Sequence, residues 1–155
     1  MDTLAKLKQY LERNQAPYEV ILHEEVYTAQ ELAQALHIPG GELVKVVIVK
    51  ADGTYRMAVL PASRRIDMEA LKKYWNAAVA VASEQEFKDL FPEAEIGAMP
   101  PFGNLYNIEV WMDTSLTTDD HIAFNAGTHY KAVRMRYSDF ERLVRPRVAS
   151  FSVRI

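Results

Sequence analysis

The segment 43–49 constrains the fold more than any other part of the chain. Its residues, Leu-Val-Lys-Val-Val-Ile-Val, are rich in β-branched side chains and apolar on both faces of an extended strand. Such a strand is covered on both sides, so we expect it in the middle of a sheet. The turn Ala51-Asp52-Gly53 leads into a second expected strand at 55–60, which makes the two segments a hairpin.

Helical patterns alternate irregularly with further strands. Apolar residues recur at helical spacing near the N-terminus, and capping boxes with Glu three residues later begin at Thr28, Ser83 and Ser138. The mixture predicts an α+β fold with a largely antiparallel or mixed sheet. The expected helices are 3–14, 28–37, 67–74, 83–91 and 138–145, and the remaining expected strands are 18–22, 78–82, 108–112, 121–125 and 130–137.

Size and composition predict one globular domain over residues 1–155. The chain is 49% hydrophobic and 25% charged, and we find no repeat or linker. It has no cysteine, which excludes disulfides, thiolate metal sites and cysteine nucleophiles. We see no signal peptide or membrane-spanning stretch and expect a cytoplasmic protein.

The net charge of −3 limits the ways in which this protein can contact nucleic acid. Proteins that grip many phosphates are usually basic, because released counterions drive that binding. We therefore expect no stable DNA binding. Any contact with nucleic acid should be local, brief or restricted to the end of the molecule.

The loop 97–103, Gly-Ala-Met-Pro-Pro-Phe-Gly, is the most unusual segment of the chain. Its two prolines fix backbone torsions, and its flanking glycines permit conformations closed to other residues. A rigid loop with free amides can hold the negative oxygen that develops when an ester carbonyl is attacked. The alternative interpretation is a plain rigid turn between a helix and a strand.

Lys45 interrupts the most apolar strand and shares a face with Leu43 and Val47. A lysine at this place either extends its ammonium to the edge of the sheet or projects it into a pocket. In a pocket, this cation could hold a phosphate or a polarised carbonyl.

The other polar residues give no conventional catalytic motif. The four histidines lack metal-ligand spacing, and the nucleophile elbow, Walker loop and dinucleotide fingerprint are absent. His129 follows Gly127-Thr128 in an expected turn, where it could face a cleft or solvent. A basic cluster near the C-terminus is either a solvated surface or a small footprint for a nucleic-acid end. It comprises Lys131, Arg134, Arg136, Arg142, Arg145 and Arg147.

Together these segments resemble the YbaK/prolyl-tRNA-synthetase-associated family of trans-editing deacylases, from residue 7 to about 144. The resemblance rests on the opening helix and the strand ending at His23, on the lysine strand 42–49, and on the G-x-x-x-P pattern at Gly97 and Pro101. It implies an α+β fold with a barrel-like central sheet surrounded by helices. It also implies hydrolysis of the ester between an amino acid and the terminal adenosine of tRNA, without metal or organic cofactor. The implied partner is the 3′ end of aminoacyl-tRNA, with an aminoacyl-tRNA synthetase as a second candidate.

The resemblance also implies roles for individual residues. Lys45 would engage the terminal nucleotide or its phosphate, and the backbone of Gly97 and Ala98 would stabilise the carbonyl oxygen. The substrate's own hydroxyl and backbone groups would position the attacking water. The amino acid removed stays open, as does the alternative of a catalytically silent nucleotide- or aminoacyl-binding module. Further expected substrate contacts are Thr28, Met99, Pro101, Phe102, Gly103, Asn125, Gly127 and His129.

Overall fold

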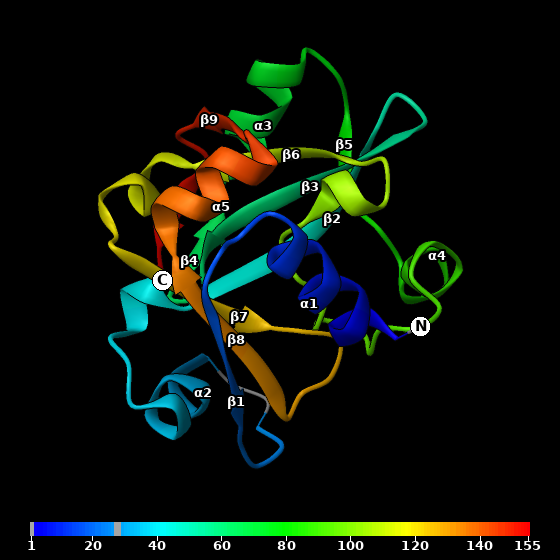
Figure 1. The fold of residues 1–155 in the computed structure, drawn as a ribbon. Coiled ribbons are helices and arrows are strands. Elements are labelled where there is room, and N and C mark those ends of the chain that lie inside the picture. Colours follow the sequence, from blue (N-terminus) through cyan, green and yellow to red (C-terminus); the bar gives the residue numbers. More distant parts are fainter. Residues whose placement is uncertain (1, 27–28) are drawn as a thin grey trace.

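A computed structural model describes residues 2–26 and 29–155 (Figure 1). The fold is α+β, as the sequence predicts, and most expected elements lie within a residue or two of their predicted bounds. The helices are α1 (Thr3–Arg13), α2 (Ala29–Leu36), α3 (Met68–Trp75), α4 (Glu84–Leu90) and α5 (Tyr137–Val144). The strands are β1 (Tyr18–Leu22), β2 (Val44–Ala51), β3 (Thr54–Pro61), β4 (Arg64–Ile66), β5 (Val79–Val81), β6 (Glu109–Asp113), β7 (His121–Asn125), β8 (Lys131–Arg136), β9 (Arg147–Ala149) and β10 (Ser152–Arg154).

The strands form a mixed five-stranded sheet, an antiparallel three-stranded sheet and a two-stranded pair. The larger sheet has the order β5-β2-β3-β6-β9, so β2 lies in its interior and forms the expected hairpin with β3. β6 pairs in parallel with both β3 and β9. The three-stranded sheet, β1-β8-β7, lies below the hairpin in Figure 1 and is linked to the larger sheet by a bridge between Leu43 and Ala123. Within the described residues, the strands do not close into a complete barrel.

The main core packs α1 and α5 against aromatic residues from the loop and the sheets. Phe102 is fully buried and contacts Phe124 and Phe140, with ring centroids 5.8 and 5.5 Å apart. Next to it, Gly103 lies so close to the following strand that an added Cβ would be 2.5 Å from the Ile108 carbonyl oxygen. The far end of the loop 97–103 is thereby fixed in the core.

The helix starts show where local patterns succeeded and failed. Ser83 and Glu86 form the complete capping box at α4, as expected. The expected cap at Ser138 is wrong: α5 begins at Tyr137, after an N-cap at Arg136 that makes no side-chain cap bond. The Tyr137 amide donates instead to the Asp120 carbonyl, and the N-cap lies two residues before the expected one.

The expected capping box at Thr28 lies outside the described residues. The short strands β4, β9 and β10 were not predicted; β10 pairs with β4, and the Phe151 amide donates to the Asp113 carboxylate at 2.9 Å. No helix in the described part of the chain is long and apolar enough to cross a membrane.

Candidate active site

Lys45 lies near the start of β2, opposite Leu60 of β3, and lines a cavity of about 170 Å³. Its ammonium makes no hydrogen bond or ion pair with any residue in 2–26 or 29–155. Burial lowers the pKa of Lys45, because the charged form loses water. A cation held in this way is suited to bind an anion or a polarised oxygen that enters from outside.

The loop after α4 reaches the same cavity through Gly97 and Met99. Gly97 has a φ of +82°, a left-handed conformation that favours glycine. Within the described residues, the amides of Gly97 and Met99 donate no hydrogen bond. The Ala98 amide, by contrast, is already hydrogen-bonded: it donates to the Glu95 carbonyl at 3.0 Å. Ala98 is also fully buried. Of the expected oxyanion pair, the Gly97 amide is therefore unbonded and the Ala98 amide is already bonded, while the unbonded Met99 amide lies one residue further along the loop.

The end of β7 and the turn after it contribute two further polar residues to the cavity wall, Asn125 and His129. The His129 ring donates from Nε2 to the Ile96 carbonyl at 2.8 Å, which fixes the backbone immediately before Gly97. The Asn125 Oδ1 atom is buried and has no hydrogen-bond partner. An unpaired amide oxygen of this kind favours a ligand or water that can donate to it.

The rest of the wall is apolar and was missed by the sequence-based prediction. The apolar spacing of α2 was readable, but which of its residues face the cavity depends on tertiary packing. The wall is built by the segment before α2, by α2 itself and by the paired ends of β2 and β3. These residues are Val26, Leu32, Leu43, Val44, Val46 and Ala62.

The model of the aminoacyl-tRNA editing domain family matches residues 23–143, which is most of the chain. The chain belongs to the aminoacyl-tRNA editing domain family. Membership confirms the resemblance drawn from the sequence and the expected class of enzyme, the aminoacyl-tRNA deacylases.

Individual relatives of this editing domain agree with the assignment. The multifunctional Ser/Thr-tRNA deacylase ProXp-y of Escherichia coli K12 is 25% identical over 154 residues, covering 96% of this chain and 92% of the relative. A proline–tRNA ligase of Staphylococcus aureus is 36% identical over 85 residues, which are 54% of this chain but 14% of the ligase. The solved structure of a candidate trans-editing enzyme for prolyl tRNA synthetase has a TM-score of 0.86 at 19% identity. That match covers 99% of this chain and 98% of the other, and it shows the fold.

Not every predicted contact of the editing domain lies at the cavity. Pro101, Phe102 and Gly103 are buried and do not line it, because this half of the loop packs into the core. Gly127 is also structural: it has a φ of +97°, and its amide donates to the Ala98 carbonyl at 2.8 Å. Thr28 lies outside the described residues.

Four of the six residues of the basic cluster form ion pairs with acidic neighbours. Arg134 pairs with Glu42 at 3.5 Å, while Arg136 and Arg142 both pair with the buried carboxylate of Asp139. Arg147 also has an acidic partner, Glu109, at 3.5 Å. Because Arg136 and Arg142 share one carboxylate, the cluster keeps a net positive charge, and both interpretations of it stay open.

Proposed function

We propose that this protein is a trans-acting deacylase that hydrolyses the ester between an amino acid and the terminal ribose of mischarged tRNA. One observation carries the proposal: Lys45, Gly97 and Met99 line a single cavity. Among the described residues, the Lys45 ammonium and the amides of Gly97 and Met99 have no hydrogen-bond partner. The similarity to a Ser/Thr-tRNA deacylase along 92% of that relative supports it.

The cavity supplies the electrostatic elements that ester hydrolysis needs. As water adds to the acyl carbon, negative charge develops on the carbonyl oxygen, and the amides of Gly97 and Met99 are the donors for it. The bond from the acyl carbon to the ribose oxygen then breaks. The proton lost by the water passes to that ribose oxygen through the adjacent ribose hydroxyl.

The positive charge of Lys45 has a separate role in this scheme. The ammonium of Lys45 has no anionic partner in the described protein, and a phosphate can supply one. Lys45 therefore binds the phosphate of the terminal nucleotide and positions the ester. His129 acts through the loop, because its hydrogen bond to the Ile96 carbonyl holds the backbone that presents Gly97.

A panel of mischarged tRNAs tests the proposal. We expect the wild type to release the amino acid from at least one of them and Lys45→Met to be slower by roughly 10²-fold, the value of a strong charge-assisted contact. Lys50→Met is the matched control, since Lys50 lies on the same strand but is exposed and pairs with Glu86. Saturable binding of tRNA without release from any member of the panel would instead identify a catalytically silent module.

A further inference from the structure

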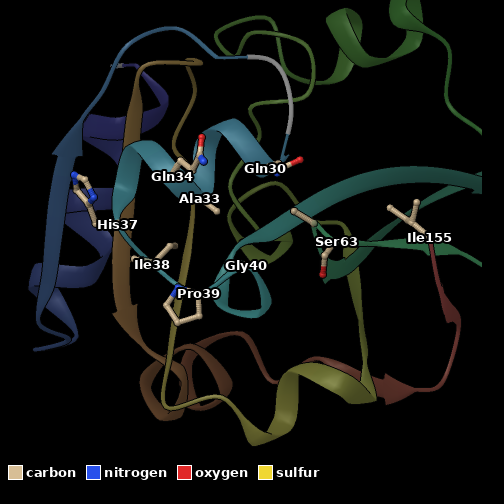
Figure 2. A pocket seen from close by; sticks show the side chains of 10 residues that line it. Gln30, Ala33, Gln34, His37, Ile38, Pro39, Gly40, Ser63 and Ile155 are labelled. Carbon is tan, nitrogen blue, oxygen red and sulfur yellow. The ribbon is translucent and has the colours of Figure 1, made fainter.

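A second hollow lies beside the catalytic cavity, on the other side of α2. It has a volume of about 760 Å³, and Figure 2 shows α2 and the segment after it on one side, with Ser63 across from them. Ala62 lines both hollows, while Leu32 of α2 faces the catalytic cavity and Ala33 faces the second one. We call this hollow the α2 groove; its lining includes Gln30, Ala33, Gln34, Ile38, Pro39 and Ser63.

The catalytic cavity is too small for the whole end of the substrate. Its 170 Å³ is below the roughly 300–1,000 Å³ of sites that enclose complete small-molecule ligands. Given the proposed function, it accommodates the aminoacyl group, and the nucleoside attached to the ester must lie in an adjoining space.

Two neighbouring hollows share wall residues with the cavity. The one between β2 and α4, which shares Val46 and Gly97 with it, measures about 150 Å³. The α2 groove is about five times larger and adjoins the cavity at Ala62. Size therefore favours the α2 groove.

The chemistry of the α2 groove matches a nucleobase better than a phosphate or a charged peptide. Among the described lining residues there is no Asp, Glu, Lys or Arg side chain. Ile38 and Pro39 offer apolar surface for a flat ring, and the amides of Gln30 and Gln34 can both donate and accept at its edge. Glutamine amides are well suited to adenine, and unpaired RNA ends are commonly read by such contacts.

We propose that the α2 groove binds the terminal adenine of the aminoacyl-tRNA while its ester lies in the catalytic cavity. This inference rests on the proposed function, and it assigns a site for the nucleobase. Gln30 and Gln34 recognise the edge of the base, so they contribute to substrate binding and take no part in the attack on the ester.

Kinetics with the double variant Gln30→Ala/Gln34→Ala test this assignment. Loss of two hydrogen bonds should raise KM for a mischarged tRNA roughly 5- to 100-fold with kcat unchanged. The same variant should match the wild type on a minimal aminoacyl ester that lacks a nucleobase. Gln85→Ala is the matched control, because Gln85 is an exposed helical glutamine on α4, outside the groove. An unchanged KM, or an equal rise on the ester without a base, would overturn the assignment.

Direct binding of adenosine separates this inference from the proposed function. Adenosine should shift the methyl NMR signals of Ala33 and Ile38 in the wild type, and the double variant should lose the shift. If the wild type deacylates mischarged tRNA but adenosine leaves these signals unchanged, the groove assignment fails and the deacylase proposal is retained. If adenosine shifts these signals but no mischarged tRNA is deacylated, the deacylase proposal fails and the groove remains a nucleobase site.

Discussion

At the scale of single residues, Lys45 carries an electrostatic cost that its surroundings do not offset. Burial lowers its pKa below the ordinary 10.5, and no described carboxylate pairs with it. Because its folded pKa is depressed, the cost is present at neutral pH and is relieved as the pH rises through that pKa. The charge therefore does not stabilise the fold, which agrees with the proposed role of Lys45 in ligand binding.

The variant Lys45→Met separates the effect of this charge on ligand binding from its effect on fold stability. We expect the variant to lose deacylation while its melting temperature at neutral pH equals or exceeds that of the wild type. Thermal unfolding and single-turnover release of the amino acid, measured on the same preparation, provide the check. A lower melting temperature together with retained activity would show that Lys45 is structural.

Asn125 allows a second residue-scale prediction. Its Oδ1 atom is buried at the cavity without a partner, so Asn125→Leu removes an unsatisfied polar atom from the interior. We expect unchanged or higher stability in chemical denaturation but a roughly 10-fold lower kcat/KM, from the loss of one hydrogen bond to the substrate. Loss of stability with intact kcat/KM would contradict a substrate contact.

At the scale of elements, the loop 97–103 joins the catalytic cavity to the core. Its first half presents the amides of Gly97 and Met99, and its second half is locked by Phe102 and Gly103. The position of the amides therefore depends on packing at the end of the loop that contacts no substrate.

Gly103→Ala tests this dependence. The new methyl group would meet the Ile108 carbonyl at 2.5 Å and a Val110 methyl at 2.7 Å, so we expect a loss of roughly 1–3 kcal/mol and reduced kcat. Gly41→Ala is the control, because nothing lies within 4 Å of its added Cβ. Urea unfolding of the two variants should separate them; equal stabilities would show that the loop is not locked in this way.

At the scale of the whole molecule, the elements that depend on residues close together in the sequence were predictable. The β2–β3 hairpin follows from a β-branched run and an Asp52-Gly53 turn, and α4 from its own capping box. The parallel pairing of β6 with β3 and β9 was not predictable, because those partners are distant in the sequence.

The candidate site was predictable to a similar extent. An isolated lysine in an apolar strand and a Gly/Pro loop are visible in the sequence, and they identified Lys45 and Gly97. Whether a backbone amide is free depends on turn geometry, so the sequence could not show that the Ala98 amide donates to the Glu95 carbonyl. The apolar wall at Leu32 and Ala62 was missed because it exists only after distant segments meet.

The pH dependence of global stability gives a further prediction at this scale. Burial, with the nearby charges of Glu42 and Asp120, raises the pKa of Asp119 from 3.8 to about 6. A raised carboxyl pKa means that the folded state binds the extra proton, so this group lowers stability as the pH rises from about 4 to 6.

Asp119→Asn should relieve that cost. At pH 7 we expect the variant to be more stable by at most about 1 kcal/mol after allowance for solvent screening, or about 2–4 °C in melting temperature. The gain should shrink to nothing below pH 4, where Asp119 is protonated in both states. A gain that is the same at pH 4 and pH 7 would exclude titration of Asp119 as its cause.

The central claim is that Lys45 binds the terminal phosphate while the amides of Gly97 and Met99 bind the acyl oxygen of the same substrate. A crystal structure with a stable analogue, 5′-phosphorylated adenosine carrying serine through a 3′ amide, tests it most directly. The account predicts the serine carbonyl oxygen within hydrogen-bond distance of the Gly97 or Met99 amide and the Lys45 ammonium on the phosphate. A bound analogue whose carbonyl lies outside the cavity, or whose phosphate is remote from Lys45, would contradict it.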